Sequence, residues 1–485
     1  MLRGALSVEL PRRLTLRESR LLLMVIGVFF LASRLALLNF NDAEFTDGYQ
    51  ILQWSFHDPI RWHPLYPLVI KPFALFLDPI FAGRLVAALA GFLTLIPLSD
   101  LARVLYGKRT ALLTCMLFAV SPLNFWLETR VLTESLFVLF CVSAVAQFLQ
   151  AINGNTKPFL LFTLFSSLAF LTRPDGYLFL PVWLYGGWKL LQRKQWKTVL
   201  LSFSFLFPSM LYLWWMSASA PDAMYEHTFG TSLLQTSVAD LVTRLAGYLE
   251  IFPYIVFYPI FVLAFLHFFS RRKEGRKNRG EIQRIWHGLL IYIVCVWFTA
   301  LCFHYAWSTR FLVAPATLIL VEAAAMLIDL ARKWKSSSSF ILASSLFAGS
   351  LVFAMAGIYG QKEVFNDIKE AAFTVEQFSG NSRIFTDEFT KTSFYTTRAL
   401  LNYDRQIPLR TGDVVMLHSF YTDLESEKRM LESKHRLRML HFSKSKVLPM
   451  LCGLPLRDAP LTNNIVASLE RFHSQNFYSV VYQIQ

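Results

Sequence analysis

Apolar stretches long enough to cross a lipid bilayer recur in this sequence up to about residue 360, and they leave few folds open. A helix of about 20 apolar residues spans the hydrocarbon core of a membrane, which is about 30 Å thick. The chain is 54% hydrophobic and 16% charged, whereas soluble domains carry about 25% charged residues. The sequence therefore predicts a polytopic α-helical membrane protein.

Eleven transmembrane helices are predicted, and the charges between them predict an orientation. The spans are residues 21–38, 82–101, 110–126, 132–150, 158–173, 177–191, 198–216, 251–269, 286–303, 309–330 and 340–359. If the basic N-terminus, residues 1–20, is cytoplasmic, every even-numbered connection is net positive, as cytoplasmic loops are. The net charge of +14 is then a consequence of topology. We find no zinc-finger, phosphate-loop or dinucleotide-binding pattern, and we expect no nucleic-acid partner.

Two parts of the chain depart from this pattern. Residues 39–81 form a long first external loop, in which the apolar segment 64–77 is too short to span a membrane and contains three prolines. We expect an interfacial or re-entrant helix there. After about residue 360, charged residues become frequent, and the short runs SRIFTDE, DVVMLHS and FYSVVYQIQ are typical of strands. Residues 360–485 thus predict a small extracytoplasmic α/β domain beside a transmembrane domain, residues 21–359.

Acidic residues open the first external loop, in the string NFNDAEFTDGYQ. Asp42, Glu44 and Asp47 follow the first span directly, at a membrane interface where charge on a carboxylate is costly. One interpretation is a solvated loop that happens to be acidic. The other is a general base for a hydroxyl acceptor. The DAE spacing would also tolerate a divalent metal.

Basic and imidazole side chains follow in the same loop, in HDPIRWHPLYP. Arg61 and His63 are candidates for binding a phosphate or a sugar hydroxyl. A single histidine at an interface is also commonly a structural hydrogen-bonding group. Both interpretations of His63 therefore remain open at this stage.

Three short external connections each carry an arginine. Arg130 lies in NFWLETRVLTESLF with Glu128 and Glu134, Arg173 lies in LTRPDGY, and Arg310 lies in FHYAWSTRF. A guanidinium group grips a phosphate through two parallel hydrogen bonds, so these residues suit a lipid-linked phosphate. Each arginine alone would also be explained by snorkelling to the lipid headgroups.

These strings together resemble the GT-C superfamily of glycosyltransferases. The similarity covers roughly residues 15–335 and rests on the acidic pair after the first span, HPLYP, TESLF, LTRPDG and STRFLVAP. The sequence is most similar to the dolichyl-phosphate-mannose-protein mannosyltransferase family and to its bacterial relatives, which include the aminoarabinose transferases for lipid A. The resemblance implies inverting transfer of a sugar from a polyprenyl phosphate to an acceptor outside the cytoplasm, and a bacterial cytoplasmic membrane.

The resemblance also assigns expected roles. Asp42 matches the catalytic acidic position, with Glu44 beside it, although Ala43 separates two acids that are often adjacent in the family. Arg310 and Arg173 match positions near the donor phosphate. We expect no obligatory metal, because arginines supply the charge, while a divalent metal remains an alternative. The expected partners are a polyprenyl-phosphate sugar donor, membrane lipids, and a lipid, glycan or protein acceptor.

Two rival functions come from other classes. A transporter or flippase for a lipid-linked saccharide would favour repeat symmetry and ions at the bilayer midplane, and the sequence shows neither. A binding protein that acts through residues 360–485 would need only a simple anchor. The sequence therefore favours a membrane glycosyltransferase.

Overall fold

The computed structural model describes residues 15–41, 43–54, 63–152, 155–219, 237–273, 280–302, 309–334, 336–377, 382–419, 422–447 and 475–485. Asp42 and Arg61, two of the predicted site residues, lie outside these ranges. The chain divides into two compact units. The helical unit contains residues 1–36, 54–356 and 451–463, and the α/β unit contains residues 37–53, 357–450 and 464–485.

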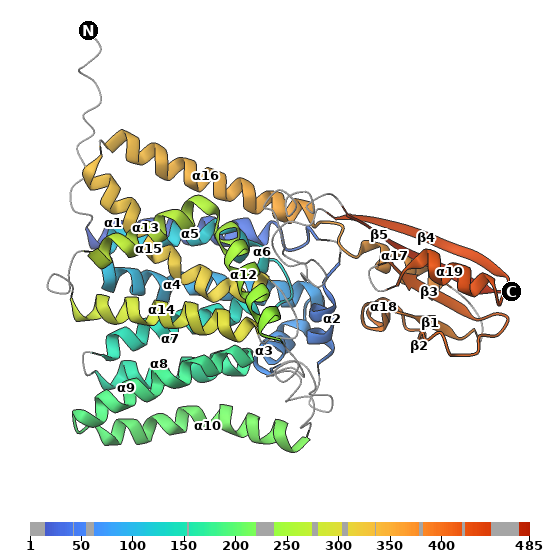
Figure 1. Cartoon of the computed structure of the whole chain (residues 1–485), viewed down its shortest axis with the longest axis horizontal. Coiled ribbons are helices and arrows are strands. Elements are labelled where there is room, and N and C mark those ends of the chain that lie inside the picture. Colours follow the sequence, from blue (N-terminus) through green and yellow to red (C-terminus); the bar gives the residue numbers. More distant parts are fainter. Residues whose placement is uncertain are drawn as a thin grey trace, which may run out of the picture. The chain divides into compact units, whose positions relative to one another are not determined.

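The helical unit is built from helices of very different length, many of which run side by side (Figure 1). Its elements are α1 (Leu16–Leu35), α3 (Leu65–Ala74), α4 (Pro79–Tyr106), α5 (Lys108–Ala119), α6 (Pro122–Leu127), α7 (Glu134–Ala151), α8 (Thr156–Thr172), η1 (Pro174–Phe179), α9 (Leu180–Gln192), α10 (Trp196–Ser219), α12 (Val238–Ile255), α13 (Tyr258–Lys273), α14 (Glu281–Cys302), η2 (Thr309–Leu312), α15 (Val313–Lys333) and α16 (Ser336–Gly360). Each predicted span overlaps one or two of these helices.

Six helices among the described residues are long and apolar enough to cross a membrane, and a bent pair brings the number to seven. The chain is thus a multi-pass integral membrane protein, but the predicted number of eleven spans is not confirmed. The segment 64–77 contains the ten-residue helix α3.

Two predicted spans are broken in the structure, each close to a proline. The span 110–126 is divided between α5 and α6, because Pro122 cannot continue the hydrogen bonding of α5. The span 251–269 is divided between α12 and α13, which meet at an angle of 106°. Phe257 adopts a left-handed backbone with φ of 74°, and Pro259 follows at the start of α13. A continuous helix cannot accommodate this conformation.

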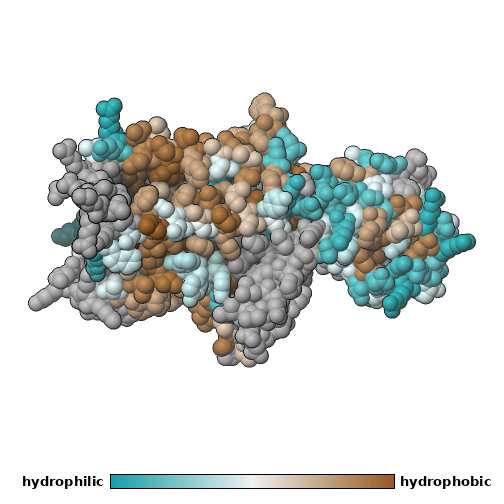
Figure 2. Space-filling view, turned by 90° about the horizontal axis from the view of Figure 1, so that it is seen from above, coloured by the Kyte–Doolittle hydropathy of each residue, from teal (hydrophilic) through white to brown (hydrophobic). Residues whose placement is uncertain are grey.

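Burial separates central from peripheral helices. In α15, 89% of the residues in the apolar window are buried, against 28% in α10 and in α16. The peripheral helices expose large side chains such as Trp214 and Val352. Figure 2 shows the resulting apolar surface over the helical unit, while hydrophilic residues predominate on the visible face of the α/β unit. An apolar surface of this kind is stable against lipid and not against water.

The α/β unit is a five-stranded sheet in the order β2-β1-β3-β5-β4 with helices packed on it. Its elements are α2 (Thr46–Gln53), α17 (Asn366–Glu376), β1 (Ile384–Thr386), α18 (Phe389–Tyr395), β2 (Leu400–Asn402), β3 (Val414–His418), α19 (Leu424–Glu432), β4 (Leu437–Val447) and β5 (Gln475–Ile484). β1 is parallel to β2 and β3, whereas β5 is antiparallel to β3 and β4. The three runs predicted to be strands therefore contribute β1, β3 and β5.

Asp367 on α17 joins that helix to the sheet through a buried polar contact. Its carboxylate accepts hydrogen bonds from the hydroxyls of Ser445 at 2.7 Å and Ser479 at 2.8 Å, and it lies 2.9 Å from His418 Nε2. Burial alone would raise the pKa of Asp367, but the bonds from His418 and the two serines hold this pKa below its usual value. The contact fixes α17 against β3, β4 and β5.

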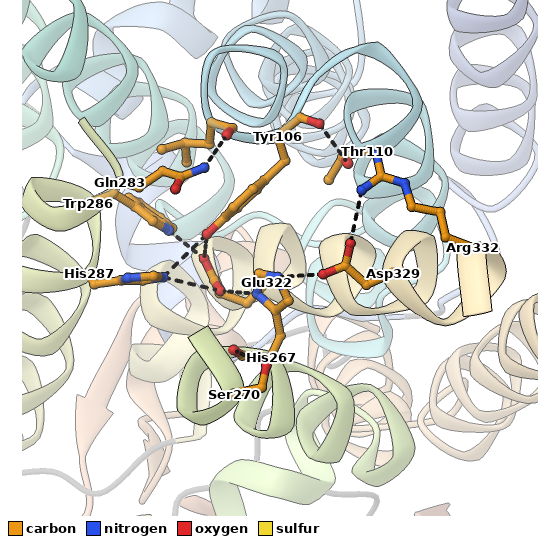
Figure 3. A network of polar contacts seen from close by, with 11 residues as sticks. Tyr106, Thr110, His267, Ser270, Gln283, Trp286, His287, Glu322, Asp329 and Arg332 are labelled. Atoms are coloured by element: carbon orange, nitrogen blue, oxygen red, sulfur yellow. Dashed lines mark hydrogen bonds and ion pairs between the residues drawn. The ribbon is translucent and has the colours of Figure 1, made fainter. Parts of the chain in front are cut away.

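A buried polar network joins four helices of the helical unit around one carboxylate, Glu322 on α15 (Figure 3). Tyr106 of α4 donates a hydrogen bond to Glu322 at 2.8 Å, and the indole of Trp286 on α14 donates another at 2.5 Å. His267 Nδ1 of α13 lies 2.5 Å from Glu322, and His287 Nε2 of α14 lies 3.6 Å away. We call these five residues the Glu322 network. It fastens α4, α13 and α14 to α15.

Loss of the charge on Glu322 should destabilise the helical unit. Glu322→Gln keeps the size of the side chain but leaves a buried set of partners without their common anion, which costs about 3–5 kcal/mol in comparable buried pairs. We expect a large fall in the melting temperature of the detergent-solubilised protein. Asp100→Asn is the control, because the Arg103–Asp100 pair is at the surface and such pairs contribute about 0–1 kcal/mol. Equal melting temperatures for the two variants would contradict the account.

Candidate functional site

The turn that carries Arg173 is dictated by the sequence LTRPDG. Because Pro174 follows, Arg173 is held in an extended conformation, with φ of −152° and ψ of 145°, and α8 ends at Thr172. Pro174 then begins the 3-10 turn η1. The first residue of a helix has no intrahelical acceptor for its N–H, so the missing N–H of proline removes no hydrogen bond there. Gly176 packs against α8 so closely that a Cβ atom would lie 2.3 Å from the backbone nitrogen of Phe170. Only glycine fits there.

A second 3-10 turn, η2, carries Arg310 and leads directly into α15. Helix α14 holds both arginine-bearing turns through hydrogen bonds to their backbone. The indole N–H of Trp297 donates a hydrogen bond to the carbonyl oxygen of Phe311 at 2.8 Å. The hydroxyl of Tyr292 donates one to the carbonyl oxygen of Leu178 at 2.7 Å. One helix thus fixes two turns that are far apart in the sequence.

Arg173 and Arg310 converge on one buried carboxylate, that of Glu134 at the start of α7. Arg173 Nη1 lies 2.7 Å from Glu134 Oε1, and Arg310 Nε lies 3.3 Å from the same oxygen. Asp175 accepts a second bond from Arg173 Nε at 2.9 Å. The ring of Phe311 lies 4.9 Å from the Arg173 guanidinium carbon and 5.2 Å from that of Arg310. We call Glu134, Arg173 and Arg310 the arginine pair site.

The arginine pair site does not fit the snorkelling interpretation. The side chains of Arg173 and Arg310 are 8% and 14% exposed, and Glu134 is 1% exposed. A snorkelling arginine extends its charged group to water or headgroups, whereas these two point to a carboxylate inside the protein. Buried cations of this kind require an anion at the same place.

Arg130 lies in the turn between α6 and α7, and it is completely buried. An ion pair supports this turn: Arg34 of α1 donates to Glu128 through Nε at 2.9 Å and Nη2 at 2.7 Å. The guanidinium group of Arg34 lies between the rings of Phe30 and Phe125, at 4.0 and 3.7 Å. The pair therefore fixes the segment that precedes Glu134.

His63 lies at the end of α8 that also carries Arg173. Its Nδ1 is 2.5 Å from the carbonyl oxygen of Phe170, and its ring packs against Phe170 and Tyr212. One ring nitrogen thus makes a structural bond. A role of His63 in substrate binding stays a prediction.

Glu44 belongs to the α/β unit, with the rest of the segment 37–53. It is completely buried, and its backbone N–H donates a hydrogen bond to the hydroxyl of Tyr49 at 2.8 Å. The next acid, Asp47, stands in the first turn of α2. The catalytic roles of Asp42 and Glu44 stay predictions.

The described residues contain no group of three or more His, Cys, Asp or Glu side chains that could hold a metal ion. The cationic groups of the arginine pair site are the guanidinium groups of Arg173 and Arg310. Such a site can bind a phosphate-like anion and stabilise negative charge that develops on it.

Two features of the site were not predicted from the sequence. Glu134 was visible in TESLF, but its contact with both arginines depends on the tertiary fold. Arg34 lies inside the first apolar span, and a charge at such a place needs a buried partner. From this rule one can predict that Arg34 has an acidic partner, but not that the partner is Glu128.

Substitution of Gly176 should disturb the Arg173 turn. In Gly176→Ala the added methyl group meets backbone atoms of Phe170, so α8 or η1 must move, at a cost of at least about 1–3 kcal/mol. We expect a lower melting temperature. Gly288→Ala is the control, since a Cβ there meets no atom within 4 Å and alanine favours a helix. Unchanged stability of Gly176→Ala would show that the turn is not tightly packed.

Comparisons with known proteins show a family match and a shared fold. Residues 62–217 match the family described as dolichyl-phosphate-mannose-protein mannosyltransferase. Among curated protein sequences, none matches the chain. The structure is similar to that of ArnT from Cupriavidus metallidurans in the apo state, with a TM-score of 0.61 and 11% identity over 87% of this chain and 95% of that one. The same protein bound to undecaprenyl phosphate gives a TM-score of 0.60 and 11% identity, over 87% and 96%. The resemblance to the mannosyltransferase family is thus confirmed over residues 62–217, and the chain shares its fold with ArnT.

Proposed function

We propose that this chain is a membrane glycosyltransferase that transfers a sugar, with inversion, from a polyprenyl phosphate to a hydroxyl group on the extracytoplasmic face. The observation that carries the proposal is the arginine pair site, in which the buried guanidinium group of Arg173 and the largely buried one of Arg310, from separate turns, meet at one carboxylate. Two comparisons support it: the matched family is one of mannosyltransferases, and ArnT, which shares the fold, binds undecaprenyl phosphate.

The proposed reaction assigns a task to each group. The acceptor oxygen forms a bond to the anomeric carbon of the sugar, and the carboxylate of Asp42 or Glu44 takes the hydroxyl proton. The bond between that carbon and the phosphate oxygen breaks, and its electron pair remains on the phosphate. Arg173 and Arg310 stabilise the charge of the departing polyprenyl phosphate. The phosphate group is thereby the leaving group, and no nucleotide is required.

Glu134 supports this assignment because it holds the two cations in place before the donor arrives. Arg173 is bonded to both Glu134 and Asp175, whereas the contact of Arg310 with Glu134 is longer, at 3.3 Å. With Asp175 the cluster holds two cations and two carboxylates, and guanidinium groups suit the tetrahedral phosphate of the proposed donor. Preorganised cations of this kind need little rearrangement as the bond breaks.

The proposal is tested by the release of its lipid product. Purified protein in liposomes is given a panel of undecaprenyl-phosphate-linked sugars together with bacterial lipid extract, and free undecaprenyl phosphate is measured. Release above that of protein-free liposomes supports a transferase. A flippase is the alternative, and the buried ionisable residues of the Glu322 network are the observation in its favour. Movement of donor between leaflets without release of phosphate would establish it.

Donor-dependent turnover should depend on the planar shape of the Arg310 side chain as well as on its charge. Arg310→Lys keeps the charge but loses the planar two-pronged contact, so donor-dependent turnover should fall, and Arg310→Ala should be worse. Turnover is compared at equal membrane abundance. Arg103→Lys is the control, because that arginine forms a surface pair. Wild-type turnover of Arg310→Lys would remove this residue from the site.

The acids of the first loop should affect turnover more than folding. Asp42→Asn keeps the shape of the side chain and removes the base, so we expect a loss of about 10²-fold or more in rate. Glu44→Gln should impair the rate less. Melting temperatures of both variants serve as the folding control. Normal transfer by Asp42→Asn would move the role to Glu44, and normal transfer by both variants would end the general-base hypothesis for this loop.

A further inference from the structure

We infer that helix α18 is the support that holds the acidic loop in its working shape, and that Tyr395 and Lys391 on α18 are positioning residues for that loop. The acidic loop is here residues 43–53, all of which the structure describes. This inference rests on the proposed function, because it concerns the same carboxylates. It adds a role for a segment about 350 residues further along the chain.

The first support is a chain of hydrogen bonds that ends at the backbone of Glu44. The hydroxyls of Tyr395 and Tyr49 form a short hydrogen bond to each other. The Tyr49 hydroxyl also accepts the bond from the Glu44 N–H at 2.8 Å. Tyr49 and Glu44 are both completely buried. Tyr395 is therefore linked through Tyr49 to the backbone of Glu44.

Aromatic packing makes the same connection. The ring of Tyr49 lies 4.9 Å from that of Phe394 and 5.6 Å from that of Tyr395, both on α18. On the other side, Phe373 of α17 lies 5.8 Å from Tyr395. The Tyr395 ring is thus placed between the acidic loop and α17, which is itself bonded to the sheet by Asp367. A rigid element stands behind the loop.

Lys391 adds a buried cation to this support. It is 1% exposed, its ammonium group lies 3.8 Å above the ring of Phe365, and it is 3.8 Å from Glu388. Phe365 packs edge-on against Phe45 of the acidic loop, at 5.8 Å. Phe365 has a left-handed backbone with φ of 59°. Non-glycine residues keep such a conformation only where packing enforces it.

The charges around Lys391 include one from the acidic loop. Burial lowers the pKa of Lys391 to about 8, against the opposing influence of four carboxylates, those of Glu388, Asp367, Asp47 and Asp387. Because Asp47 is among them, the lysine interacts electrostatically with the loop. The described part of the loop is therefore held by a hydrogen bond to its backbone, by ring packing and by the charge interaction of Asp47, all of which involve α18 or its neighbours.

Tyr395→Phe in the full-length protein tests the inference, because it removes one hydroxyl and little volume. Hydrogen–deuterium exchange of the peptide covering residues 43–53 is the first measurement and requires no activity. We expect exchange at this peptide to increase at least several-fold, with a melting temperature close to that of the wild type. Tyr403→Phe is the matched control. It removes a hydroxyl that donates a hydrogen bond to Glu427 at 2.7 Å, and both residues belong to the α/β unit but lie outside the acidic loop.

Turnover is the second measurement. A misplaced base slows the chemical step and leaves donor binding intact, so kcat should fall about 10-fold for Tyr395→Phe while KM for the donor stays within about two-fold. Lys391→Met should likewise lower kcat and leave KM for the donor nearly unchanged. Unchanged exchange overturns the inference, and so does increased exchange with unchanged kcat. A wild-type protein that releases no polyprenyl phosphate would refute the proposed function instead, and the exchange result would still decide whether α18 holds the loop.

Discussion

A buried arginine needs an anion beside it, and this requirement organises the helical unit around Glu134. The charges of Arg173 and Arg310 are removed from water, where hydration would stabilise them, so their mutual repulsion must be offset inside the protein. One oxygen of Glu134 contacts both side chains, at 2.7 and 3.3 Å, and Asp175 adds a second carboxylate beside Arg173. The surrounding structure serves to bring the three groups to the same place.

The scaffolding of the arginine pair site is itself polar and buried. Tyr292 and Trp297 of α14 bond to the backbone beside η1 and η2, and the Glu322 network fastens α14 to α15 (Figure 3). Glu322 lies about 14 Å along α15 from its first residue, given the rise of a helix. Hydrogen bonds and ion pairs are strong in a low dielectric when every partner is present. A membrane unit can therefore fix the positions of polar side chains without a large soluble core.

Much of the helical unit could be predicted from the sequence, because apolar length and the prolines act locally. LTRPDG alone predicts a helix end followed by a tight turn, which is what Pro174 and Gly176 produce. The break between α12 and α13 was missed, since an apolar run of this length conceals the left-handed Phe257. The arginines were found as single candidates. Their meeting at Glu134 depends on packing between helices, which no spacing in the sequence encodes.

The acidic loop shows the same limit more clearly. Its carboxylates stand out because they follow an apolar span, yet the contacts of Tyr49 with Tyr395 join segments 346 residues apart. Strand patterns in the last quarter of the chain predict a sheet, but they do not predict that the sheet's helices hold the loop. Long-range contacts of this kind arise only when the whole α/β unit is assembled.

The central claim is that the arginine pair binds the phosphate of a polyprenyl lipid, and equilibrium binding of undecaprenyl phosphate tests it most directly. Binding to the purified wild type should be saturable and should weaken at least about 10-fold in Arg310→Ala, in line with the loss of a charge-assisted contact worth about 1.5–3 kcal/mol. Arg103→Ala, which removes a surface arginine, should bind like the wild type. Equal affinity of Arg310→Ala and the wild type would contradict the account.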